Sequence, residues 1–137
     1  MDASVLLCDW AEELNGKLYV QGAGWSNLVG GQVAQIALAI LIEVPWDQAN
    51  RPHGLKVELL DEDGNFVTVD DQPVLLMDGK IEVGRPAGIP PGTPLNVPLA
   101  GRFVLPPTLS AGGYRVQLSI DGTVMRAVPF RIMEGPH

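Results

Sequence analysis

The chain has 137 residues, of which 46% are apolar and 18% are charged, and its formal net charge is -7. This composition predicts a folded, soluble protein, because disordered chains combine low hydrophobicity with high charge. The length is typical of one domain, so we predict a single domain over residues 1–137. The acidity argues against nucleic acid and anionic membranes as partners, since their phosphates attract clustered Lys and Arg.

The acid excess is confined to the first half of the chain. Residues 1–70 carry 11 acids and 3 bases, whereas residues 71–137 carry 5 acids and 6 bases. We interpret the acidic half as solvated strand faces and turns. The alternative is a two-signed surface that pairs head to tail or recruits a basic partner.

Cysteine usage and the lack of a targeting signal favour a cytoplasmic protein. Cys8 is the sole cysteine, so no intramolecular disulfide can form, which suits a reducing compartment. The first four residues are acidic where a signal peptide is basic. The most apolar run, 33–44, is too short to cross a bilayer core of about 30 Å.

The N-terminal region is predicted to contain a strand followed by a hairpin. The run from 5 to 12 has apolar residues at its even positions, which are Leu6, Cys8 and Trp10. Asn15-Gly16 is a strong hairpin-turn signal, and 17–21 forms the returning strand. Gly22 and Gly24 then indicate a bend before Trp25.

The apolar run Val33–Val44 is predicted to be a long central strand. Every second residue is apolar, namely Ala34, Ile36, Leu38, Ile40, Ile42 and Val44. Ala and Leu also favour a helix, which is the alternative interpretation of this segment. No helix-capping residue precedes the run, and Pro45 ends it.

The rest of the chain reads as short strands punctuated by Gly and Pro. Strands are predicted within 55–59, 66–69, 73–83, 99–105, 114–120 and 123–132. Asp78-Gly79 interrupts 73–83, and the proline-rich stretch 85–98 is an extended connection. In the last run Val124, Val128, Phe130 and Ile132 share one phase, and Pro129 lies opposite, which suits an edge or a bulge.

These elements predict an all-β protein, an antiparallel immunoglobulin-like β-sandwich of about eight or nine strands. Tyr114 follows Ser110-Ala111-Gly112-Gly113 and resembles the tyrosine corner of such folds, in which a tyrosine bonds back to upstream backbone. Tyr114, Trp10, Phe103 and Phe130 are the aromatic residues that we predict in the core.

No residue pattern indicates catalysis, a metal site or a cofactor, so we predict a non-enzymatic protein. The two histidines are His53, in a predicted loop, and His137, the last residue. A hydrolase that uses His53 as its base is the least favoured alternative, since no nucleophile motif accompanies it. Asp61, Asp63 and Asn65 lack the ligand spacing of a calcium loop and are typical of a turn.

The loop Pro45–Gly54 is the best candidate for ligand or partner binding. It concentrates aromatic and polar side chains, namely Trp46, Asp47, Asn50, Arg51 and His53. We expect this loop, the 85–98 stretch and the turn at 121–122 to emerge at one end of the fold. In the alternative interpretation Trp46 plugs the core, while Asp47 and Asn50 satisfy backbone groups of the turn.

The second face of the 33–44 strand is a candidate for self-association. Ala37, Ala39 and Leu41 make this face too apolar to lie in water. We expect it to be covered by the 84–98 segment, by a short helix or by a second subunit, as in a homo-oligomer.

Four segments together resemble one family: LLCDWAEELNGKLYVQGAGW, ALAILIEVPWDQANRPH, VELLDEDG and GGYRVQLSIDG. It is a family of small uncharacterised bacterial immunoglobulin-like domains of unknown function. The resemblance implies a stand-alone sandwich and carries no activity. Taken with the residues, it favours a module for protein–protein interaction or self-assembly. A small-ligand or carbohydrate-binding sandwich that uses the 45–54 loop is the alternative.

Overall fold

The computed structural model describes residues 1–31 and 34–135, and this part of the chain is built of β-strands with a single turn of 3-10 helix. The strands are β1 (Asp2–Cys8), β2 (Trp10–Leu14), β3 (Lys17–Gln21), β4 (Asn27–Val29), β5 (Ala34–Val44), β6 (His53–Asp61), β7 (Thr68–Val69), β8 (Gln72–Pro73), β9 (Leu75–Ile81), β10 (Leu95–Leu105), β11 (Gly112–Ile120) and β12 (Thr123–Met133), and the 3-10 turn is η1 (Trp46–Gln48). The all-β class is confirmed. The described strands outnumber the eight or nine expected, partly because the run 5–12 divides into two and because β4 lies in an expected loop.

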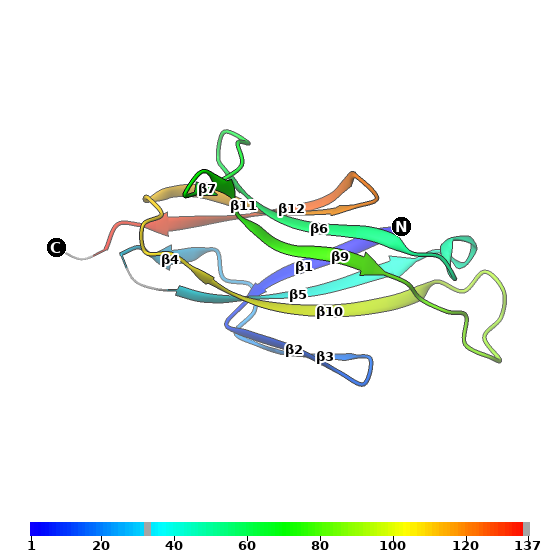
Figure 1. Ribbon diagram of the computed structural model, residues 1–137. Coiled ribbons are helices and arrows are strands. Elements are labelled where there is room, and N and C mark those ends of the chain that lie inside the picture. The colour runs from blue at the N-terminus through cyan, green and yellow to red at the C-terminus, as the bar shows by residue number, and fades with distance from the viewer. Residues whose placement is uncertain (32–33, 136–137) are drawn as a thin grey trace.

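Two larger sheets face each other across the core (Figure 1). One has the order β1-β5-β10 and the other β4-β12-β11-β6-β9, and the pairs β2-β3 and β7-β8 form small additional sheets. The ladders are antiparallel except that β4 runs parallel to Arg131–Met133 of β12. The expectation of a purely antiparallel arrangement is therefore wrong at this edge.

β5 is the central strand of the three-stranded sheet, as predicted, and the helical alternative is wrong. It pairs with β1 on one side and with β10 on the other. Its inward side chains are fully buried, and these are Ile36, Leu38, Ile40, Ile42 and Val44. They pack in one cluster with Val57, Leu59, Val116 and Leu118 of the opposite sheet. Val33 lies outside the described residues.

The inward face of β1 is formed by odd-numbered residues, contrary to expectation. Ala3 and Leu7 belong to the main core, while Leu6 is exposed on the opposite face. The chain then leaves the sheet at Asp9, whose N–H donates to the carbonyls of Gln21 and Gly22. Trp10 consequently starts the β2–β3 hairpin and is 38% exposed, so its predicted place in the core is wrong.

A bulge divides β12 into two phases. The register between β11 and β12 shifts at Leu118 and Ser119, so Val124 is exposed and Met125 packs on the core instead. The single phase predicted for 123–132 therefore holds only beyond the bulge. Pro129 lacks an N–H group, but no ladder hydrogen bond is lost. Its nitrogen points to the same side of β12 as the Arg131 N–H, which donates to the Ser26 carbonyl. On that side β4 pairs only with residues 131–133, so it does not reach Pro129.

The proline-rich connection is shorter than predicted. β10 begins at Leu95, so Pro98 lies inside a strand and pairs with Leu41. β10 is at the edge of its sheet, where a proline is tolerated. β9 is an edge strand of the five-stranded sheet. It continues through Asp78-Gly79 without a break, because both residues pair with β6.

Candidate functional site

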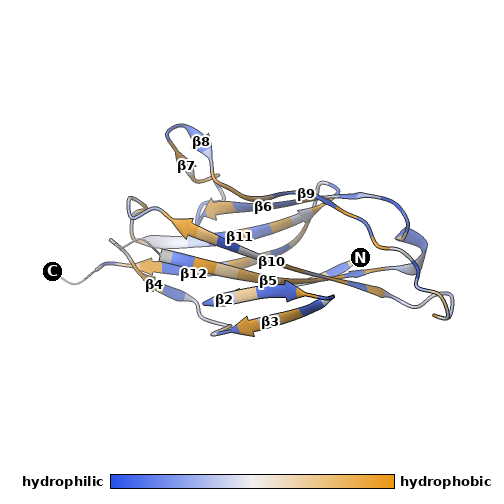
Figure 2. Cartoon of the chain, turned by 60° about the horizontal axis from the view of Figure 1, so that its bottom comes forward, coloured by the Kyte–Doolittle hydropathy of each residue, from blue (hydrophilic) through white to orange (hydrophobic). Residues whose placement is uncertain are grey.

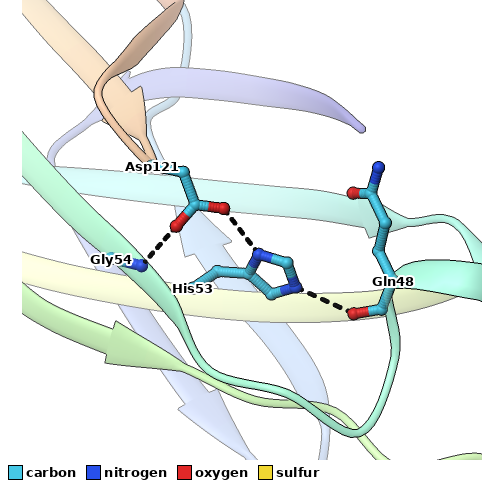
Figure 3. Close-up of polar contacts among 4 residues, drawn as sticks. All are labelled: Gln48, His53, Gly54 and Asp121. Carbon is cyan, nitrogen blue, oxygen red and sulfur yellow. Dashed lines mark hydrogen bonds and ion pairs between the residues drawn. The ribbon is translucent and has the colours of Figure 1, made fainter.

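His53 links the 45–54 loop to the β11–β12 hairpin (Figure 3). It is the first residue of β6 rather than a loop residue, and it is buried. Its Nδ1 lies 2.6 Å from Oδ2 of Asp121, and its Nε2 lies 2.8 Å from the carbonyl oxygen of Gln48 at the end of η1. The other Asp121 oxygen accepts from the Gly54 N–H at 2.9 Å. The side chain of Asp121 therefore joins the 121–122 turn to the start of β6.

The partners of His53 determine its protonation state. A backbone carbonyl only accepts hydrogen bonds, so Nε2 must carry a proton. A proton on Nδ1 as well lets both nitrogens donate, one to Asp121 and one to Gln48. These two hydrogen bonds raise the pKa of His53 and outweigh its burial, which lowers it. The same contact lowers the pKa of Asp121, aided by the Gly54 N–H.

Trp46 is fixed by an arginine from the segment after β9. Arg85 donates from Nε and Nη2 to the Trp46 carbonyl oxygen, at 3.1 and 2.6 Å. Its guanidinium also lies over the indole ring, 4.7 Å from the centroid. Trp46 is half-buried by this contact and lies outside the core clusters of the described residues, so the interpretation of Trp46 as a core plug is wrong.

The other candidate residues of this loop are exposed. Asn50 adopts a left-handed conformation with φ of 61°, and its N–H donates to the Val83 carbonyl at 2.8 Å. Asp47 and Arg51 point to solvent. Among the described residues, Asn50 thus shapes the turn through its backbone, and not through a side-chain bond to the backbone of the turn as the alternative interpretation expected. The three expected segments do lie together. Trp46 contacts Arg85 of the proline-rich stretch, and His53 contacts Asp121 of the hairpin turn.

No local sequence pattern indicated Arg85 and Asp121 as partners of this loop. The Asp121-Gly122 pattern predicts a hairpin turn, and the Asp121 φ of 51° is the left-handed value that such a turn needs. Its partner His53 is 68 residues away in the sequence. The expectation that the 45–54 loop and the 121–122 turn share one end of the fold was the only signal that pointed to this pairing.

The β2–β3 hairpin, rather than one of the three expected elements, covers the second face of β5. Ala37 and Ala39 are buried in a small cluster with Cys8 and Ala11, against which Leu18 and Ala100 pack. Small side chains on both layers let the hairpin approach the sheet closely. Ala37 and Ala39 are therefore not available for self-association, whereas Leu41 is 39% exposed.

The β2–β3 hairpin contains hydrophobic as well as hydrophilic residues (Figure 2), and several of its apolar side chains are exposed. The register pairs Glu12 with Tyr19 and Leu14 with Lys17, which places Trp10, Leu14 and Tyr19 on one face as diagonal neighbours. All three are exposed, Tyr19 to 52%. The guanidinium of Arg102 lies over the Trp10 ring, 4.0 Å from the centroid, and ties this face to β10.

Comparison with known proteins identifies the family. The sequence model of a family of unknown function, DUF6941, matches residues 3–133. The chain belongs to the DUF6941 family. The expected resemblance to a family of unknown function is thereby confirmed. No curated protein matches this DUF6941 sequence.

Three further features of this DUF6941 chain bear on its chemistry. Asp61 Oδ1 accepts from the N–H groups of Asp63 and Asn65, at 2.9 and 3.0 Å, so these residues form a turn stabilised by a side chain. Within 1–31 and 34–135, no group of three His, Cys, Asp or Glu residues is arranged to hold a metal ion. The same part of the chain contains no helix with the length and hydropathy needed to span a membrane.

Proposed function

We propose that this protein is a non-enzymatic interaction module that self-associates through the hairpin surface, defined as Trp10, Leu14 and Tyr19 with the neighbouring Leu6 and Leu41. The observation that carries the proposal is the exposure of these five large apolar side chains on the hairpin and on the sheet face that it covers in part. Aromatic residues and arginine are enriched at protein interfaces, and Trp10 and Tyr19 offer large, stiff contact area beside Arg102.

The charges on the outer hairpin face support a second copy as the occupant. Glu12 and Lys17 lie on the same face as Trp10, Leu14 and Tyr19. In a two-fold symmetric contact each residue meets the same surface of its partner, so Glu12 of one hairpin can face Lys17 of the other. The register also makes Leu6 a diagonal neighbour of Leu41, which extends the apolar area onto the sheet.

The arrangement of His53 supports the non-enzymatic assignment. In a catalytic Asp–His pair, the nitrogen opposite the carboxylate faces a nucleophile or a substrate. In this protein that nitrogen faces the Gln48 carbonyl instead. His53 is thus bonded on both sides and has a structural role. Since Trp46 is covered in part by Arg85, the ligand-binding alternative at the 45–54 loop is the less favoured one.

Two finer assignments belong to the same proposal. We assign the fold to the immunoglobulin-like sandwiches, with Tyr114 as the tyrosine corner: its hydroxyl donates to the Ser110 carbonyl at 2.6 Å. We assign the protein to the cytoplasm of a bacterium, a setting that suits a lone, buried and free Cys8.

Sedimentation analysis over a wide concentration range tests self-association. The wild-type chain should associate as its concentration rises, and the double variant Leu14→Ser/Tyr19→Ser should stay monomeric with an unchanged thermal midpoint. Val124→Ser is the matched control, because Val124 is equally exposed but lies on β12 of the opposite sheet. A wild-type chain that is monomeric up to about 1 mM would overturn the proposal, since such weak association has little use.

A further inference from the structure

A hollow lies on the other side of the molecule, on the outer face of the five-stranded sheet. It has a volume of about 320 Å³ and is lined by Ser26, Glu62, Gly113, Arg115, Pro129 and Arg131, among others. Tyr114, Phe130 and Ile132 point into the core, so the alternating residues between them point outward. The outer face of β11 and β12 is thereby left to form the hollow.

Two arginines converge on this hollow. Arg115 pairs with Pro129 and Gly113 pairs with Arg131, so the two arginines are diagonal neighbours on one face of the ladder. Gly113 and Pro129 lie between them and project little side chain. The two guanidinium groups, with only Gly113 and Pro129 between them, form a positively charged site in a protein whose net charge is negative.

A carboxylate of the chain itself already occupies part of the hollow. The side chain of Glu62 lies over Gly113, since a Cβ placed on this glycine would come within 2.8 Å of Glu62 Oε2. That oxygen is 3.5 Å from Nη2 of Arg131, and the Glu62 carbonyl accepts from Arg115 at 3.0 Å. The ion pair is long and more than half exposed, so it holds Glu62 only weakly.

The remaining hydrogen-bonding capacity of the arginines can serve a second carboxylate. Each guanidinium has five N–H donors in a planar fork that matches a carboxylate. Within the described residues, Glu62 engages Nη2 of each arginine. The two arginines and Glu62 leave a local charge of about one positive unit. This charge matches one carboxylate group better than one phosphate group, because a carboxylate group carries a single negative charge and a phosphate group carries about two.

We propose that this hollow is a carboxylate-binding site formed by Arg115 and Arg131, in which Glu62 acts as an internal competitor. The ligand is a carboxylate group, carried either by the acidic side chains of a peptide or by a small dicarboxylate. The site is independent of the hairpin surface, because it lies on the opposite sheet. Its test is therefore separate from the test of self-association.

NMR titration of the full chain, with hexaglutamate and glutarate as separate probes, tests this site. The Gly113 and Arg131 amide signals should shift, and Arg131→Gln should weaken binding about tenfold, the effect of losing one charge-assisted contact. Glu62→Gln should tighten binding severalfold, because the competitor loses its charge. A response to hexaglutamate alone identifies a peptide ligand, and a response to both probes identifies the carboxylate itself as the determinant.

Arg126→Gln is the matched control. Arg126 is also an exposed β12 arginine in an ion pair, but its partner is Asp2 at 3.0 Å, outside the hollow. Its replacement should leave binding unchanged. Arg115→Gln provides a second variant should Arg131→Gln lower the thermal midpoint. The proposal is overturned by any of three results: no shift at Gly113 with either probe, binding unaffected by both hollow variants, or equal binding of inorganic phosphate.

Discussion

Nδ1 of His53 lies 2.6 Å from Oδ2 of Asp121, and this contact joins the start of β6 to the β11–β12 turn across 68 residues of sequence. The same ring forms a hydrogen bond with the Gln48 carbonyl, so one imidazole ring links η1, β6 and the turn. A buried histidine with a hydrogen bond at each ring nitrogen makes the stability of this end of the molecule depend on pH.

The free energy of unfolding should fall as pH rises through the raised pKa of His53. Below the ordinary histidine pKa of 6.5 the ring is protonated in both the folded and unfolded chains, and the stabilisation is complete. At higher pH the unfolded chain releases its proton first, and the stabilisation disappears once the folded histidine also titrates. The lowered pKa of Asp121 acts at the acid end, where stability is lost as pH falls below the ordinary value of 3.8.

Urea unfolding between pH 5 and pH 9, together with NMR titration of the histidine ring, measures this dependence. Asp121→Asn should lower the pKa of His53 and flatten the pH profile, while Asn retains a preference for the left-handed turn conformation. A His137→Gln background leaves a single histidine to observe. An unchanged His53 pKa in Asp121→Asn would show that the contact does not form in solution.

Enlarging Ala39 should separate the hairpin from the sheet. This residue is buried between β5 and the hairpin, in the cluster of Cys8 and Ala11. Ala39→Leu adds three carbons to a closely packed layer, which should destabilise the protein by about 1–3 kcal/mol. Leu41→Ala, two residues along the same face but exposed, should cost about 0.5 kcal/mol or less. Chemical denaturation followed by tryptophan fluorescence compares the two, and equal stability would argue against hairpin docking.

Removing the hydroxyl of Tyr114 should destabilise the loop 106–111, which joins β10 to β11. This hydroxyl donates to the Ser110 carbonyl, while the ring stacks on Phe130 with centroids 5.7 Å apart. Tyr114→Phe retains the stacking and loses the hydrogen bond, at a cost of about 1 kcal/mol. Tyr19→Phe, on the exposed hairpin face, should leave the thermal midpoint unchanged. Calorimetry on both variants would contradict this role if their midpoints fell equally.

Gly101 should not tolerate a methyl group, whereas Gly79 should. A Cβ on Gly101 would lie 2.7 Å from Cζ of Phe103 and 3.0 Å from Cε of Met77, so Gly101→Ala should cost about 1–3 kcal/mol. Gly79 lies on β9, an edge strand of the five-stranded sheet, and nothing lies within 4 Å of a Cβ placed on it. Gly79→Ala should be neutral or slightly stabilising, because alanine restricts the unfolded chain. Adding Phe103→Leu to Gly101→Ala should restore part of the loss, measured by urea unfolding; no recovery would mean that the Phe103 ring is not the obstacle.

Local patterns in the sequence were sufficient to predict most of the longer strands and two hairpin turns. The alternation in 34–44 predicted β5, because one face of that strand is wholly apolar. Asn15-Gly16 and Asp121-Gly122 predicted two hairpins, since both pairs occupy left-handed conformations in the structure. The expected bond from Tyr114 to upstream backbone is also present, because its partner Ser110 is only four residues away.

The tertiary structure decided which apolar faces are covered and which polar groups meet. Trp10 and Ala39 both occur in apolar patterns, but only docking of the β2–β3 hairpin buries Ala39 and leaves Trp10 exposed. Likewise the pairing of His53 with Asp121 follows from the ladder between β6 and β11, which brings two turns that are distant in the sequence to one end of the five-stranded sheet. Short-range periodicity reports the shape of one segment, whereas burial and ion pairing depend on how separate segments pack. The sequence by itself thus determined an acidic all-β chain, and packing determined where its surfaces can bind.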